Sequence, residues 1–246
     1  MADVNAHGLA RHIPAEVKRA VRQSCGFGCV VCGSALIEYE HVDPPFAWAK
    51  AHDPSGITLL CPQCHAKVTR KFMTKAAVAA AMEAPACRRA GFASEMFLLG
   101  AKTPYLVFAG LTLRSCPTPI QVGDFPLFRF EQGEESGAPI RFSGTFFSSS
   151  GDVSLTIDEN EWRPRTSNFD VELMGGTLTI WDAPRHVSLR LRFADEAVVV
   201  EDVDMICGPY RFLGGRAKLE VISPGGSVMS MTGCLADNCN IGLMLG

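Results

Sequence analysis

Two Cys-x-x-Cys pairs are the residues of this chain with the clearest chemical meaning. The first pair is Cys29 and Cys32, and the second is Cys61 and Cys64. Four thiolates in two short pairs form the ligand set of a tetrahedral zinc ion, because each turn presents two sulfurs about 2.3 Å from one metal. The sequence therefore predicts a structural zinc held by these four cysteines.

Acid and imidazole groups lie between and just after the pairs. The dipeptide Glu40-His41 separates them, and His65 follows the second pair directly. A carboxylate and an imidazole can share one divalent metal, and a second imidazole that binds no metal can move a proton near neutral pH. All three groups are present, so these residues favour metal-assisted acid–base chemistry.

The elements that must position these groups follow from the spacing of apolar residues. Helical spacing predicts a basic helix from Ile13 to about Ser24. Alternating side chains predict a strand over 36–42, with Glu38 and Glu40 on one face, and a short strand over 57–60. A helix from about Gln63 and an Ala-rich helix over 75–83 complete the order strand, loop, strand, helix.

This order, with its paired cysteines, Glu40-His41 and His65, resembles the HNH nuclease family over about residues 13–75. The resemblance implies an α+β fold that begins with a zinc-stapled ββα-metal module. It also implies that Glu40 and His65 hold a catalytic Mg²⁺ or Mn²⁺ ion. By the same resemblance His41 is the general base, and the substrate is DNA, with RNA as a further alternative.

The chain departs from the family pattern at two positions. Gly56 stands where the middle Asn of the motif is expected, and Glu40 replaces the usual Asp. In the family, that Asn helps to hold the general-base His in position. A non-catalytic zinc module that binds DNA or a protein is therefore the alternative. We interpret His52, in the same loop, as an exposed loop histidine without an assigned role.

Basic residues follow His65 at helical spacing. Lys67, Arg70 and Lys71 are expected to contact phosphate oxygens, with Lys67 and Lys71 near one helical face. Such contacts would add affinity without sequence preference. An ordinary solvated helix face is the alternative interpretation.

Length and charge predict two domains. The chain has 246 residues, and basic residues exceed acidic ones by four in residues 1–94, whereas acidic residues exceed basic ones by seven in residues 95–246. We expect a nuclease-like module with flanking helices over 1–94 and a second domain over 95–246. A mildly basic first part suits a polyanionic partner.

The second domain is predicted to be rich in β-strands. Alternating runs with Gly, Pro, Asp and Asn between them favour a mostly antiparallel sandwich or barrel that serves recognition, oligomerisation, binding of a protein partner or sensing. The clearest runs are 105–108, 140–143, 153–157, 177–180, 187–193 and 217–221.

Composition also yields an expectation about the compartment. The sequence has neither a basic head with an apolar run at its start nor a stretch near the ~20 apolar residues that span a bilayer, so a cytoplasmic protein without a membrane partner is expected. In that setting the remaining cysteines are free thiols, and Cys25 is not a fifth zinc ligand.

Overall fold

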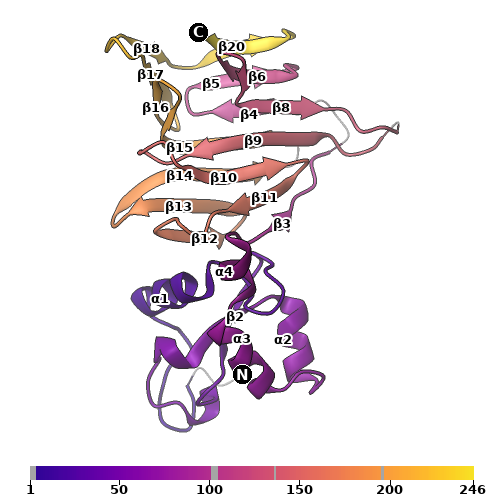
Figure 1. Cartoon of the computed structure of the whole chain (residues 1–246), viewed down its shortest axis with the longest axis vertical. Coiled ribbons are helices and arrows are strands. Elements are labelled where there is room, and N and C mark those ends of the chain that lie inside the picture. The colour runs from indigo at the N-terminus through magenta and orange to yellow at the C-terminus, as the bar shows by residue number, and fades with distance from the viewer. Residues whose placement is uncertain (1–3, 101–104, 136, 195–196) are drawn as a thin grey trace. The chain divides into compact units, whose positions relative to one another are not determined.

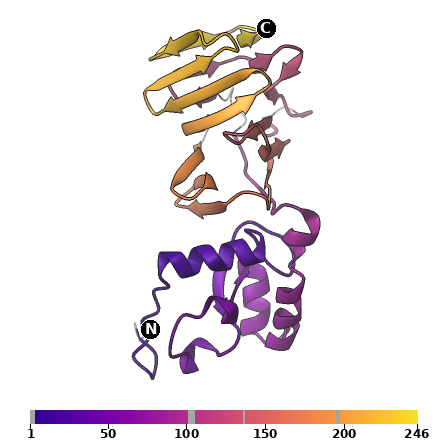
Figure 2. The same cartoon turned by 60° about the vertical axis from the view of Figure 1, so that its left-hand side comes forward.

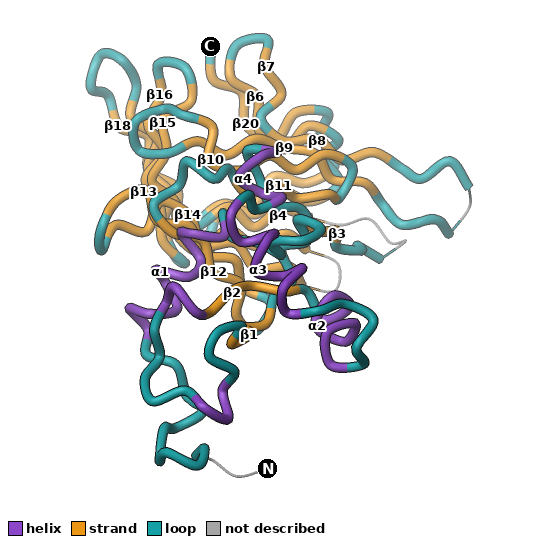
Figure 3. Tube along the Cα trace, turned by 60° about the horizontal axis from the view of Figure 1, so that its bottom comes forward, coloured by secondary structure: helices purple, strands orange, loops and turns teal. Residues whose placement is uncertain are grey.

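The computed structural model describes residues 4–100, 105–135, 137–194 and 197–246. Contacts within the chain divide it into two units (Figure 1). The first unit comprises Met1–Glu95 together with a returning segment, Pro164–Asp170, and the second comprises Met96–Arg163 and Val171–Gly246. Figure 3 shows that the helices belong to the first part of the chain, whereas the rest consists of strands and loops.

The first unit is built from short helices around a two-stranded sheet. Its elements in chain order are α1 (Ala15–Cys25), β1 (Glu38–His41), the 3-10 turns η1 (Phe46–Trp48) and η2 (Pro54–Gly56), β2 (Ile57–Leu60), α2 (Pro62–Thr69), α3 (Lys75–Glu83) and α4 (Ala86–Ala90). The strands β1 and β2 are antiparallel, with Glu38 opposite Leu60 and His41 opposite Ile57. The helix α2 begins directly after β2, so strand, strand and helix follow one another as predicted.

The helix α1, the long indigo helix in Figure 2, lies against β2. Val21 on α1 and Leu59 on β2 are fully buried in the same core cluster, which also includes Val78 of α3. Gly26 ends α1 in the left-handed conformation, with φ of 74°, which a residue without Cβ adopts without strain. The helix therefore stops just before the first cysteine pair.

A buried ion pair ties the returning segment to α1. Asp170 is fully buried, and its Oδ1 and Oδ2 accept hydrogen bonds from Nε and Nη2 of Arg22 at 2.9 and 2.6 Å. Arg19 contributes a further bond from Nε to Oδ2 at 3.0 Å, and the side-chain amide of Gln23 donates to the carbonyl of Phe169. Residues almost 150 positions apart therefore complete one compact unit.

The second unit is composed of strands in three sheets. One sheet has the order β3-β11-β10-β9-β8, and a three-stranded sheet has the order β20-β6-β7. The largest sheet runs from β12 to β18 in sequence order, and β4, β5 and β19 join it through β15. The strand bounds are β3 (Glu95–Met96), β4 (Tyr105–Phe108), β5 (Leu111–Arg114), β6 (Thr118–Val122), β7 (Phe125–Pro126), β8 (Phe128–Glu131), β9 (Arg141–Phe147), β10 (Val153–Asp158), β11 (Glu161–Pro164), β12 (Asp170–Met174), β13 (Thr177–Ala183), β14 (His186–Ala194), β15 (Ala197–Cys207), β16 (Tyr210–Gly215), β17 (Lys218–Ile222), β18 (Val228–Met231), β19 (Cys234–Asp237) and β20 (Ile241–Leu245).

Aromatic side chains join two of these sheets. Phe128 and Phe142 extend from the five-stranded sheet, and Phe108 and Phe212 from the largest sheet; all four are fully buried. The ring centroids of Phe108 and Phe128 are 5.5 Å apart, and those of Phe108 and Phe212 are 6.1 Å apart. This spacing is typical of packed aromatic pairs, so the rings form the core of the unit.

Among the described strands most pairs are antiparallel, but parallel pairs also occur. Strand β4 runs parallel to β15, β5 to β19 and β20 to β6. Side-chain alternation has the same period in both kinds of sheet, so the sequence did not predict these pairs. Within the described residues, no helix has the length and apolar character needed to cross a membrane.

Candidate functional site

The four predicted zinc ligands converge in the first unit. One sulfur from each of Cys29, Cys32, Cys61 and Cys64 lies within 4.8 Å of the other three. The Sγ atoms of Cys32 and Cys61 are 3.5 Å apart. In a tetrahedral site with bonds of about 2.3 Å, ligand sulfurs lie about 3.8 Å from one another, so the donor set fits one zinc ion.

Backbone hydrogen bonds shape both turns of this cluster. Cys29 N–H donates to the carbonyl of Ser34, and Gly33 N–H donates to the carbonyl of Cys29. At the second pair, Sγ of Cys61 caps α2 by accepting from the N–H of Cys64 at 3.3 Å. These bonds hold each pair in a tight turn, so its two sulfurs face one point.

Gly28 brings a neighbouring helix close to the first pair. A Cβ at this position would lie 2.7 Å from Sγ of Cys87 and 2.9 Å from the carbonyl oxygen of Ser34. Only a glycine allows this approach. Cys87 nevertheless lies outside the four-sulfur cluster, and Cys25 contacts Oγ1 of Thr58 at 3.5 Å instead.

Two carboxylates and one imidazole form a second group. The ring of His65 on α2 lies between two acids of β1, with Nδ1 2.5 Å from Oε2 of Glu38 and Nε2 3.1 Å from Oε2 of Glu40. When Nδ1 donates its proton to Glu38, the lone pair of Nε2 faces the carboxylate of Glu40. Two acceptors this close need a proton or a cation between them.

The spacing of Glu40 and His65 fits a hard divalent ion. Two ligands at about 2.1 Å from one octahedral ion, at right angles, are about 3.0 Å apart, close to the observed 3.1 Å. Glu38 would then orient the metal-binding ring from its far side, as carboxylates commonly do for metal-bound imidazoles. Sequence reasoning placed Glu38 on the face of Glu40 but gave it no role.

Lys75 is also part of this group. Its Nζ lies 3.0 Å from Oε1 of Glu40 and donates to the backbone carbonyl of His41. The ammonium group therefore neutralises one carboxylate oxygen of Glu40 while the other faces His65. Lys75 belongs to no motif in the sequence, although it stands at the start of the helix predicted over 75–83.

His41 is buried and forms a chain of contacts with His52. Nε2 of His41 lies 3.1 Å from Nδ1 of His52, whose Nε2 lies 2.9 Å from the carbonyl oxygen of Ala10. That carbonyl can only accept, so His52 donates from Nε2 and, when neutral, accepts at Nδ1. His41 must then donate from Nε2, which leaves its Nδ1 as the basic nitrogen.

The surroundings of His41 favour its neutral form. Burial, followed by the charge of His52, lowers the pKa of His41 below its usual value. The ring of Phe46 packs edge-on against it, with centroids 5.3 Å apart. The interpretation of His52 as a residue without a role therefore changes, because it contacts His41 directly.

Gly56, where the family resemblance leads us to expect an Asn, has a steric explanation. A Cβ on Gly56 would lie 2.1 Å from the carbonyl oxygen of Asp43. The loop closes so tightly here that no side chain fits at this position. Any residue that positions His41 must therefore come from elsewhere, and His52 is the one that contacts its Nε2.

Glu40, His41 and His65 line one cavity. Its volume is about 220 Å³, and Arg11, Ile13, Tyr39, Phe46 and Lys75 complete its walls. The guanidinium of Arg11 stacks over the ring of Phe46 at 4.7 Å. The cavity thus combines two cations with the acid and imidazole groups.

The basic residues after His65 are exposed. Lys67 lies on α2, but the helix ends at Thr69, with Arg70 as its C-cap. Lys71 follows with φ of 64°, outside the helix. The expectation that Lys67 and Lys71 lie along one helical face was therefore wrong, because the helix is too short.

Comparison with known protein families, with curated proteins and with solved structures finds no match for this chain.

Proposed function

We propose that the first unit is a metal-dependent endonuclease of HNH type that hydrolyses DNA phosphodiester bonds. The observation that carries this proposal is the convergence of Glu40 and His65 at 3.1 Å in a cavity that His41 also lines. These residues come from both ends of a strand-strand-helix unit next to four clustered cysteines. This is the arrangement that the family resemblance implies.

The proposed roles follow from the chemistry of the donors. Glu40 and His65 hold a Mg²⁺ or Mn²⁺ ion, which would supply positive charge to the phosphate and the leaving oxygen. His41 accepts a proton from water at Nδ1 while His52 fixes its ring through Nε2. Glu38 orients the ring of His65.

Cationic side chains support binding of a polyanion. Arg11 and Lys75 line the cavity, and Lys67, Arg70 and Lys71 are exposed beyond His65. These groups can contact phosphate oxygens without reading bases. The β-rich second unit would then serve recognition of a target or partner, oligomerisation or sensing.

A non-catalytic zinc module that binds DNA or a protein is the second candidate. Lys75 favours this candidate. Its ammonium group already pairs with Oε1 of Glu40 and so neutralises the carboxylate that would bind a metal. A metal ion would have to compete with this charge.

Cleavage assays separate the two candidates. Purified wild-type protein with confirmed bound zinc is incubated with plasmid and single-stranded DNA and with RNA, in Mg²⁺, Mn²⁺ or EDTA. We expect metal-dependent cutting that His41→Ala reduces by at least about a hundredfold, as loss of a general base does.

The matched control is His7→Ala, which alters an exposed histidine outside the cavity and should leave cutting unchanged. If zinc-loaded wild type binds DNA but cuts none of the substrates with either metal, the non-catalytic module is the correct assignment.

A further inference from the structure

The second unit contains an apolar pocket with no part in the proposed chemistry. Its volume is about 480 Å³, and it is lined by Val122, Gly123, Phe125, Phe147, Cys207, Gly208, Pro209, Tyr210 and Gly246. None of these residues carries a charged side chain. A pocket of this size lies within the range that binds small molecules, about 300–1,000 Å³.

Three glycines line this pocket. Gly123 lies in the turn between β6 and β7, and Gly208 in the turn between β15 and β16, with φ of 57° and 56°. A Cβ at Gly123 or Gly246 would meet no atom within 4 Å, and one at Gly208 would only touch Val122 at 3.7 Å. The positive φ of Gly123 and Gly208 explains why glycine forms these two turns.

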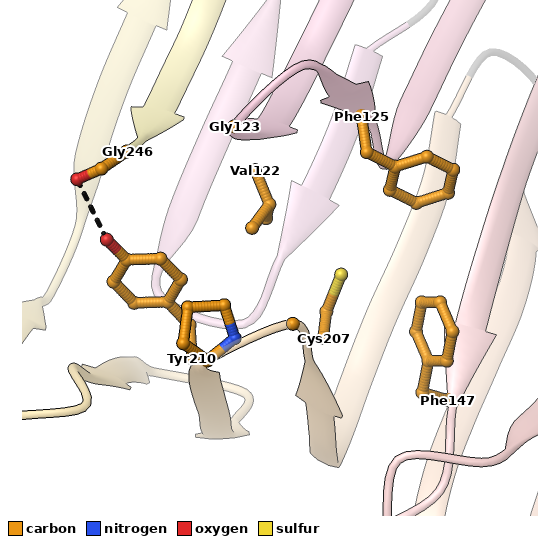
Figure 4. Close-up of a pocket in the computed structure, with 9 residues that line it drawn as sticks. Val122, Gly123, Phe125, Phe147, Cys207, Tyr210 and Gly246 are labelled. Atoms are coloured by element: carbon orange, nitrogen blue, oxygen red, sulfur yellow. Dashed lines mark hydrogen bonds between the residues drawn. The ribbon is translucent and has the colours of Figure 1, made fainter.

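Rings form the walls on two sides of the pocket. Figure 4 shows Phe125 and Phe147 on one side of Val122 and Cys207, and Tyr210 on the other. The two phenylalanine rings contact edge to face, with centroids 6.5 Å apart. Phe125 remains 43% exposed, so a bound molecule could still bury part of a large apolar side chain.

Polar groups at the pocket are satisfied or neutral. The hydroxyl of Tyr210 donates to the carbonyl of Gly246 at 3.0 Å. Burial raises the pKa of Cys207, so its thiol stays uncharged. Asp124, between Gly123 and Phe125 in the chain, is exposed and outside the lining, and its negative charge disfavours anions nearby.

We propose that this pocket binds one uncharged, predominantly apolar small molecule that carries a planar ring system. Ring walls on two sides offer stacking and edge contacts to a flat ligand. The side chains of the lining are uncharged and offer no counter-charge to an ionised group, whose desolvation would then be uncompensated.

A fluorescence titration tests the proposal. Nile red, an uncharged fused-ring dye, is titrated onto the full chain, and 2-naphthol and 2-naphthoate then compete with it. These competitors share one ring system and differ in charge. We expect saturable binding of one dye per chain and displacement by 2-naphthol at concentrations at least about tenfold lower than by 2-naphthoate.

Two variants test whether the dye binds in this pocket. Val122→Phe fills the pocket and should weaken binding at least about tenfold, whereas Val228→Phe alters an exposed valine of β18 and should leave binding unchanged. If Val122→Phe fails to fold, Phe125→Ala tests the same site, because it removes a half-exposed ring from the pocket wall and should also weaken dye binding.

Three results would overturn the proposal. The first is the absence of saturable binding. The second is dye binding that neither Val122→Phe nor Phe125→Ala weakens. The third is a dimer in sedimentation experiments that becomes a monomer in the Val122→Phe variant. The last result would mean that a second copy of the chain covers the pocket.

Discussion

At the scale of single residues, the contact between His41 and His52 is the most informative. A histidine with no assigned role in the sequence accepts from the proposed base and donates to a carbonyl. It thereby selects one tautomer of His41. Under the proposed function, this second imidazole would hold the base in position.

We expect His52→Ala to lower kcat of DNA cleavage by about tenfold to a hundredfold with little change in KM, as loss of a group that orients a catalytic residue does. His52→Gln should restore part of kcat, because an amide can also accept from His41 and donate to Ala10. Steady-state kinetics with a defined oligonucleotide measures both constants. Equal loss in both variants would argue against positioning.

His186 provides a pH-dependent contact in the second unit. Its Nδ1 lies 2.5 Å from Oδ1 of Asp182, and its Nε2 lies 3.1 Å from Oδ2 of Asp204. The hydrogen bond to Asp182 raises the pKa of His186 above its usual 6.5. A group with a raised folded pKa stabilises the fold fully below the unfolded pKa and loses this contribution as pH rises through the folded pKa.

The second unit of the wild type should therefore lose stability relative to His186→Gln as pH rises from about 6.5. Urea unfolding between pH 5.5 and 8.5, followed by the fluorescence of Trp162 and Trp181 in a Trp48→Phe background, measures the difference. Parallel pH profiles for the two proteins would refute a contribution from the raised pKa.

At the scale of elements, the ion pair between α1 and the returning segment should contribute strongly to the stability of the first unit. Arg22 retains only 6% side-chain exposure and Asp170 none. Removal of one partner of a buried pair leaves the other charge without compensation, which costs about 3–5 kcal/mol.

Asp170→Asn should lower the free energy of unfolding of the first unit by an amount of that order. Circular dichroism at 222 nm reports it, because the helices of the described residues all lie in the first unit. The control is Asp237→Asn, which breaks an exposed pair with Arg114 and should leave the curve unchanged. Equal shifts in both variants would count against the buried pair.

The zinc cluster should be equally important for these helices. Metal binding supplies folding free energy to small units, so Cys61→Ser should abolish zinc binding and most of the helical signal. Cys234→Ser, which alters an exposed thiol outside the cluster, should change neither. Metal analysis by mass spectrometry and circular dichroism provide the measurements. Cys61→Ser protein that kept its zinc would disprove the four-cysteine site.

Elements with a strong local signal were predictable from the sequence. The helix over 75–83 and the strand over 57–60 have the predicted bounds, and the cysteine cluster has the predicted members. Local periodicity and ligand spacing determine these features. The parallel pairing of β4 with β15 was not predictable, since it depends on contacts between distant strands.

The candidate site was predictable in part for the same reason. The spacing of Glu40, His41 and His65 relative to the cysteine pairs indicated these residues. By contrast, the folding of the loop brings His52 to the site, and the position of the first turn of α3 brings Lys75 there. Asp170 pairs with Arg22 of α1 although the two residues are 148 positions apart in the sequence, and nothing in the sequence around Asp170 indicates this contact.

At the scale of the whole molecule, the first unit is discontinuous in sequence. A fragment of residues 1–95 contains all four cysteines and the cavity residues but lacks Asp170. It should bind zinc yet unfold at a lower urea concentration than the same helices in the full chain, because Arg22 is left buried without its carboxylate. Identical urea midpoints would show that the returning segment adds no stability.

This discontinuity affects the order of events during synthesis. Chains generally fold from the N-terminus as they emerge from the ribosome, but α1 here must wait for Asp170, which follows all five strands of the five-stranded sheet in the sequence. The unit with the proposed hydrolytic site therefore reaches its full stability late in translation. A nascent or prematurely terminated chain would carry that site only in a weakened form, which would limit unregulated cleavage of nucleic acid in the cell.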